Sequence, residues 1–199
     1  MTNTIYISEL LATRLSHDLI GNIGAVANAV ELLNEGDDDS KDIFNILNFS
    51  STVLNKRLKF FRLCFGLSNA SVKDAQALID ITTDYLSTLG NPNLPITLTM
   101  DIETPKIYKF ILPAVMMMAD TIVKGGQIIA KQNDKGIHIS AVSDAPLSQT
   151  KLNNLDLILS GKEAEENPSA YAPLYYLLEY LADGDIAIKR QDNTLIIGE

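Results

Sequence analysis

Residues 8–34 read SELLATRLSHDLIGNIGAVANAVELLN and predict one long amphipathic helix. Apolar side chains recur at the spacing of one helical face, and Ser8 is the expected N-cap. An acidic break follows, in which Gly36 can end this helix and Asp39 or Ser40 can cap the next one. The predicted apolar face comprises Leu11, Leu15, Leu19, Ile23, Val26, Val30 and Leu33.

Residues 41–67 predict a second helix that is apolar on more than one side. A two-helix hairpin cannot bury two apolar faces by itself. We therefore expect the hairpin to pair with a second copy and form a four-helix bundle, which makes the protein a homodimer. The alternative is that the C-terminal domain covers the second face.

The pattern changes after residues 68–71 to a mixture of helices and strands. The fold class is therefore α+β, with residues 1–69 as a helical hairpin and residues 70–199 as an α/β sandwich domain. Helices are expected at 72–89, 108–123, 149–159 and 172–181, and strands at 96–100, 127–131, 137–142, 186–189 and 194–197.

Composition narrows the classes of partner. The 199 residues carry a formal net charge of −9, which argues against nucleic acid, because that binding needs a basic surface. Cys64 is the only cysteine, so neither an intrachain disulfide nor a cysteine metal cluster is expected. We find no signal peptide and no apolar run long enough to cross a membrane, and we expect a cytoplasmic protein without a membrane partner.

His17 is the residue on the first helix with the clearest chemical potential. Gly21 and Gly24 lie within about 40° of it around the helix, whereas Leu19 and Val26 lie on the opposite side. The imidazole should therefore be exposed beside two positions without side chains. Glycine within a helix costs about 1 kcal/mol relative to alanine, so these two glycines indicate a close approach, either by a partner's loop or by another helix.

Folding the hairpin about Gly36 brings Lys56 level with His17. Positive charge there would suit a transferring phosphoryl group, and Asp18 could orient the ring or accept its proton. The alternative is an ordinary solvated histidine on a basic surface, and His138, in an expected strand, is interpreted as structural. Four cations are expected around the imidazole, namely Arg14, Lys56, Arg57 and Lys59.

Two segments carry a family resemblance. Residues 12–28 (ATRLSHDLIGNIGAVAN) resemble the dimerisation and phosphotransfer helix of sensor histidine kinases, and more closely that of the ChpT family of bacterial histidine phosphotransferases. Residues 58–66 (LKFFRLCFG) are similar to the second helix of that family. The resemblance implies that His17 is phosphorylated with the help of Asp18. The expected contacts to a partner or phosphoryl group are Arg14, Gly21, Asn22, Gly24, Lys56, Arg57, Lys59 and Phe60.

The C-terminal half resembles the ATP-binding domain of histidine kinases in the order of its elements, but its nucleotide motifs are eroded. Residues 114–120 contain no asparagine to help hold magnesium. Asp144 is kept without the two glycines that should follow it, and residues 169–174 contain no glycine-rich turn. We expect no ATP and no bound cofactor, with Mg²⁺ supplied by the partner's acidic site.

The resemblance implies a function in a multistep phosphorelay. A phosphoryl group would pass through His17 between receiver domains of a hybrid histidine kinase and of response regulators. Two alternatives stay open: a histidine autokinase without its sensor, and a scaffold that binds receivers without chemistry. Whether the chain is an enzyme in its own right is left open as well.

Overall fold

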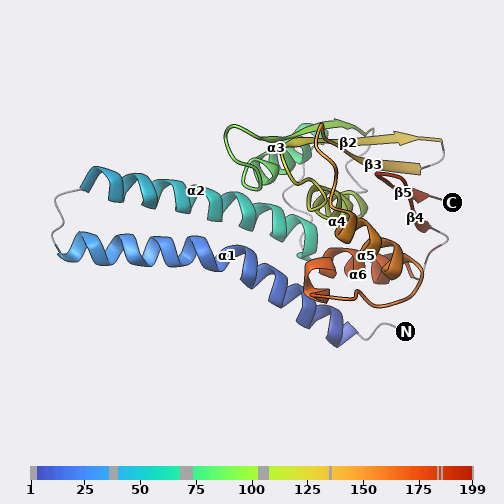
Figure 1. Cartoon of the computed structure of the whole chain (residues 1–199), viewed down its shortest axis with the longest axis horizontal. Coiled ribbons are helices and arrows are strands. Elements are labelled where there is room, and N and C mark those ends of the chain that lie inside the picture. Colours follow the sequence, from blue (N-terminus) through green and yellow to red (C-terminus); the bar gives the residue numbers. More distant parts are fainter. Residues whose placement is uncertain are drawn as a thin grey trace.

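The computed structural model describes residues 4–35, 40–67, 74–102, 108–134, 136–182, 184 and 186–198. It confirms the α+β class, with a long helical hairpin joined to a domain built on one sheet (Figure 1). In chain order the elements are α1 (Thr4–Glu35), α2 (Ser40–Phe65), α3 (Ala75–Leu86), β1 (Ile96–Asp101), α4 (Tyr108–Ala119), β2 (Gly126–Asn133), β3 (Gly136–Val142), α5 (Gln149–Leu159), the 3-10 helix η2 (Pro168–Tyr171), α6 (Ala172–Leu181), β4 (Ala187–Gln191) and β5 (Thr194–Gly198).

The start of α1 differs from the prediction. The helix begins at Thr4, and the Ser8 hydroxyl donates to the Thr4 carbonyl at 2.9 Å, so Ser8 lies within the helix and is not its N-cap. The extra turn buries Ile7 in the same core as Leu10, which explains why the helix continues toward the N-terminus. The expected stop at Gly36 and the boundary at 68–71 lie outside the described residues.

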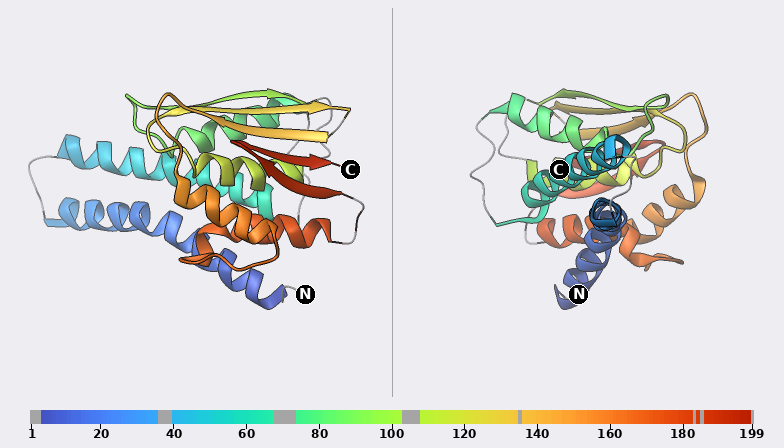
Figure 2. Two further views of the ribbon diagram at one scale, coloured as in Figure 1. Left: turned by 45° about the vertical axis from the view of Figure 1, so that its right-hand side comes forward. Right: turned by 90° about the vertical axis from the view of Figure 1, so that its left-hand side faces the viewer.

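The sheet has five strands in the order β1-β2-β3-β5-β4. β1 pairs with β2 in parallel, and the other neighbours are antiparallel. Helices cover one face of the sheet, where side chains such as Ile128 and Ile139 are fully buried (Figure 2). Every residue of α4 from Ile111 to Ala119 is buried beneath this face, which gives the domain an apolar centre.

The base and the tip of the hairpin have different surroundings. At the base, α1 contacts α6 and η2 while α2 contacts α3 and α4, so that Ile7 and Phe60 belong to the same apolar core as Leu112. The C-terminal half thus covers the second apolar face here, as the alternative stated. The rest of the hairpin projects away from the domain (Figure 1). Exposed apolar side chains on α1 and α2 include Ile20, Ile23, Val30, Leu32, Phe44, Ile46, Phe49 and Leu58.

None of the helices within the described ranges is long and apolar enough to span a membrane.

Candidate functional site

His17 projects from α1 into solvent, as its helical phase predicts. Its side chain is 83% exposed, and Nδ1 lies 3.4 Å from Oδ1 of Asp18. A Cβ atom added at Gly21 or Gly24 would meet nothing within 4 Å. Close helix packing within this chain therefore does not explain the two glycines, and the surface beside His17 is open. Asn22, another predicted contact, is half-buried.

Arg14 is the centre of an ionic network behind His17. Its Nε donates to Oδ2 of Asp18 at 2.8 Å, and its two terminal nitrogens donate to Asp120 at 2.7 and 3.2 Å. Nη1 also donates to the carbonyl of Ala170 at 2.8 Å. Only 8% of Arg14 is exposed, and two carboxylates of this chain pair with it, so its predicted contact with a phosphoryl group stays a prediction.

The network keeps Arg14 charged despite its burial. Burial lowers the pKa of Arg14, but the carboxylate of Asp120, its hydrogen bond and the carboxylate of Asp18 raise this pKa by more. A guanidinium suits this position because its planar fork can meet two carboxylates at once. Arg14 therefore links α1 to the end of α4 and to η2.

Asp120 and Lys151 are members of the site that the sequence analysis missed. Asp120 directly follows the buried helix α4, and Lys151 on α5 places its ammonium 3.8 Å from Oδ2 of Asp120. A sequence signal for Asp120 did exist. A carboxylate that follows a wholly apolar run such as residues 114–119 needs a cationic partner if the chain buries it. No comparable signal marks Lys151.

Arg57 confirms the predicted level of the two helices. It donates to the carbonyl oxygen of Asp18, the neighbour of His17. Its other hydrogen bonds reach Thr88, with Nε donating to the hydroxyl at 3.1 Å and Nη2 to the carbonyl at 3.0 Å. Arg57 thus braces α1 against the end of α3.

Lys56 is paired with groups at the end of α3 rather than with His17. Lys56 donates to the Ser87 hydroxyl at 3.0 Å and pairs with Asp84 at 3.0 Å, so its charge is directed to α3. Lys59 is exposed. The prediction that Lys56 contributes its charge at the imidazole is thus wrong, because Asp84 on α3 and Ser87 just after that helix bind its ammonium.

Phe60 cannot be a partner contact. Its side chain is fully buried and stacks on Tyr85, with ring centroids 3.9 Å apart. The prediction for this residue is wrong because α3 and α4 cover the base of α2.

A pocket of about 340 Å³ lies beside His17 and is formed by both halves of the chain. It brings together three predicted residues, His17, Asp18 and Arg14, with Lys151 and part of the segment before α6. The pocket is lined by Thr13, Arg14, His17, Asp18, Lys151, Asn167, Ser169 and Ala170.

The segments that correspond to nucleotide motifs have other packing partners here. Residues 114–119 are buried among apolar side chains. The segment 168–171 packs on α1, where Arg14 donates a hydrogen bond to the carbonyl of Ala170. Asp144 is exposed in the loop after β3.

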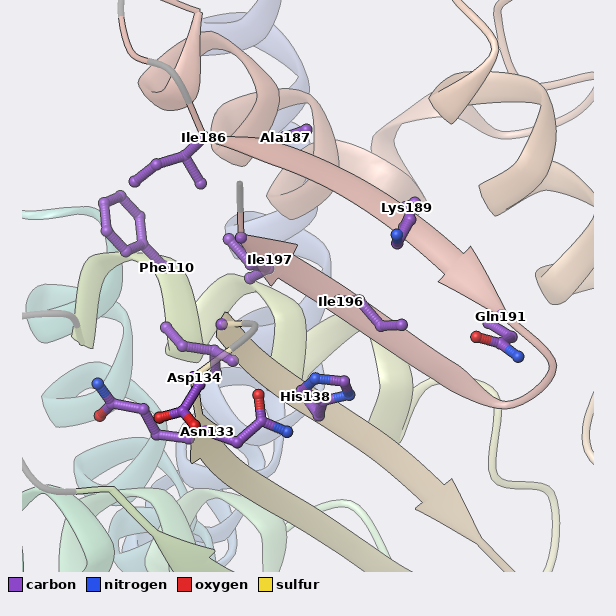
Figure 3. A pocket seen from close by; sticks show the side chains of 14 residues that line it. Phe110, Asn133, Asp134, His138, Ile186, Ala187, Lys189, Gln191, Ile196 and Ile197 are labelled. Atoms are coloured by element: carbon purple, nitrogen blue, oxygen red, sulfur yellow. The ribbon is translucent and has the colours of Figure 1, made fainter.

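A larger groove of about 770 Å³ lies at β3, β4, β5 and the start of α4 (Figure 3). Apolar Phe110 and Ile197 line it together with Asp134, Lys189 and His138. It shares no lining residue with the pocket at His17. Among the described residues, no group of three His, Cys, Asp or Glu could hold a metal ion. The structural interpretation of His138 stays a prediction.

The fold and the site together define a class: an α+β protein that presents an exposed histidine on a helical hairpin, braced by a sheet domain. A solved bacterial phosphotransferase has the same fold, with a TM-score of 0.73 at 23% identity, over 99% of this chain and 97% of that one. The similarity in fold therefore covers the hairpin and the sheet domain together.

A sequence relative narrows the class. The protein phosphotransferase ChpT of Brucella abortus (strain 2308) is 33% identical over 84 residues. The aligned segment spans 40% of this chain and 38% of that relative, which is less than half of either. No protein-family model matches the chain. The chain is thus similar in sequence to a ChpT protein over 84 residues, and similar in fold to a bacterial phosphotransferase over nearly its whole length.

Proposed function

We propose that the protein is a histidine phosphotransferase of a phosphorelay, and that His17 carries the phosphoryl group between aspartates of receiver domains. The observation that carries the proposal is the exposed imidazole with the Asp18 carboxylate facing Nδ1. The match to ChpT of Brucella abortus supports it.

The chemistry follows from the ring's geometry. With a proton on Nδ1 directed at Asp18, the Nε2 atom of His17 keeps its lone pair and is the nucleophile. Nε2 attacks the phosphorus of an aspartyl phosphate: an N–P bond forms, the P–O bond breaks, and the receiver's carboxylate leaves with the electron pair. The phosphorylated ring is cationic, and the Asp18 carboxylate stabilises that charge. Transfer to the second receiver is the same step in reverse.

The partners in this proposal are receiver domains of a hybrid histidine kinase and of response regulators. The open surface at Gly21 and Gly24 would admit a receiver loop close to the backbone of α1. We expect the receiver's acidic site to supply Mg²⁺ and this chain to need neither ATP nor a cofactor of its own. A cytoplasmic location belongs to the same proposal.

A second copy of the chain is the proposed occupant of an apolar stripe on α1. Ile20, Ile23 and Val30 lie within about 80° of one another around the helix, and 63%, 49% and 45% of them are exposed. Such a stripe on a projecting hairpin is what two copies need to form a four-helix bundle. The bundle would set His17 of each copy on its outer surface.

The test is transfer of labelled phosphate from a phosphorylated receiver. We expect His17→Ala to abolish labelling and His138→Gln, which removes the other histidine, to leave it intact. Label that persists in His17→Ala would contradict the site.

The same assay separates the alternatives. Labelling by ATP alone would identify an autokinase. A receiver that binds wild type and His17→Ala equally well, with no label passing to either, would identify a scaffold.

A further inference from the structure

Asp120 connects the sheet domain to His17 through two intervening side chains. The carboxylate of Asp120 accepts a hydrogen bond from each of the two terminal nitrogens of Arg14, at 2.7 and 3.2 Å. The Nε of Arg14 donates to Oδ2 of Asp18 at 2.8 Å, which leaves Oδ1 of Asp18 facing Nδ1 of His17 at 3.4 Å. The chain of contacts therefore runs from the end of α4 to the reactive ring.

The burial of these groups decides how much they can move. The side chains of Arg14, Asp18 and Asp120 are 10%, 15% and 13% exposed, whereas that of His17 is 83% exposed. A carboxylate on an open helix surface would exchange rotamers freely. Asp18 is restricted to one rotamer, because Arg14 is hydrogen-bonded to one of its oxygens. Arg14 is itself fixed, because its terminal nitrogens are hydrogen-bonded to Asp120. The exposed imidazole thus faces a fixed acceptor.

We propose that Asp120 is a positioning residue for phosphoryl transfer, which fixes Asp18 through Arg14 so that His17 keeps its proton on Nδ1 and presents Nε2. The inference rests on the proposed function for its kinetic consequence but not for its effect on the ring. It also assigns a role to the sheet domain: α4 ends in the carboxylate that orders the phosphotransfer helix.

The first test is Asp120→Asn, which keeps the shape and removes the charge. We expect the single-turnover rate of transfer at saturating receiver to fall about 10-fold, as for other residues that orient a reacting group, with no change in the Kd for the receiver. The matched control is Asp156→Asn, which breaks another Arg–Asp pair, Arg190–Asp156, between β4 and α5. This control should leave both quantities unchanged.

The second test asks whether Asp120 acts through Asp18. If it does, Asp18→Ala together with Asp120→Asn should be no slower than Asp18→Ala alone. Losses that multiply would overturn the proposal, because they would show that Asp120 acts by another route.

The third test needs no receiver. The imidazole ¹⁵N chemical shifts of the unphosphorylated protein report which nitrogen carries the proton. We expect the population with the proton on Nδ1 to fall in Asp120→Asn and to stay unchanged in Asp156→Asn. If wild type accepts no phosphoryl group, the proposed function fails, whereas these shifts still decide the positioning role.

Arg14→Lys covers the case in which Asp120→Asn unfolds the protein. A lysine keeps the charge, but its single ammonium cannot bridge two carboxylates as the guanidinium fork does. We expect the same change in ¹⁵N shifts and the same fall in rate. Wild-type shifts and rate in this variant would overturn the proposal.

Discussion

At the residue scale, Tyr85 is the least satisfied side chain near the ionic network. It is fully buried, stacks on Phe60, and its hydroxyl has no hydrogen-bond partner within the described part of the chain. Burial raises its pKa well above the ordinary range of tyrosine, and the carboxylate of Asp120 adds to the shift. The ring of Tyr85 therefore stabilises the fold by packing, while its unpaired hydroxyl lowers the free energy of unfolding.

Tyr85→Phe should therefore raise the free energy of unfolding by about 1 kcal/mol at neutral pH, because it removes an unpaired buried hydroxyl. Unfolded tyrosine ionises near a pKa of about 10, but burial raises the pKa of folded Tyr85 above that value. The unfolded state thus holds fewer protons above about pH 10, and wild type loses stability as pH rises, a loss that the variant escapes. Denaturant titrations at pH 7 and above pH 10 measure both effects.

The difference in free energy of unfolding between Tyr85→Phe and wild type should increase as pH rises above about 10. A destabilised Tyr85→Phe at pH 7 would show that the hydroxyl has a partner, such as a buried water. An advantage that stays constant above pH 10 would contradict the raised pKa.

At the element scale, α1 packs against the sheet domain at one end and carries helix-weakening glycines beside His17. Its apolar side chains pack at the base, whereas Gly21 and Gly24 weaken it next to His17. Since a Cβ atom there meets nothing within 4 Å, the glycines serve no packing contact inside this chain. We propose that they admit a receiver's loop close to the backbone of α1.

Gly24→Ala separates helix stability from partner access. The variant should raise the free energy of unfolding by about 1 kcal/mol, because alanine favours the helix and fits the open space. Transfer from a phosphorylated receiver should become slower, because the methyl group stands where the receiver loop approaches. Denaturant unfolding and the labelled-phosphate assay measure the two effects. Faster or unchanged transfer in a stabilised variant would contradict close approach at this position.

At the scale of the whole molecule, the two halves share one apolar core and one ionic network. The sheet domain covers the base of the hairpin and supplies Asp120, Lys151 and residues 167–170 to the surroundings of His17. It leaves the apolar stripe of α1 uncovered, and this stripe is the surface that we propose for a second copy of the chain.

Val30→Glu should convert the proposed dimer into a monomer, because it places a charge within the apolar stripe. The matched control is Leu32→Glu on the same helix, since two residues separate the side chains by about 160°. Leu32 is also an exposed aliphatic residue. Sedimentation equilibrium gives the masses. A dimer that survives Val30→Glu, or that dissociates equally in Leu32→Glu, would contradict this interface.

The sequence by itself determined the elements and the exposure of the histidine. Helical spacing and strand alternation depend on local periodicity, so α5, α6 and all five strands were predicted within a few residues, and the phase of α1 placed His17 outward. The length of the hairpin predicted that Lys56 lies level with His17, and the residue after Lys56, Arg57, does donate to the carbonyl oxygen of Asp18.

Only the tertiary structure decided what the cations and the core residues do. A side chain pairs with the acceptor that long-range packing brings near, and no local pattern reveals that acceptor. Arg14 meets Asp120, which is 106 residues away in the sequence, and Lys56 meets Asp84 on α3. Phe60 is buried because α3 and α4 fold over it. The reactive histidine is thus visible in one helix, whereas the groups that hold its neighbour in place come from a distant part of the fold.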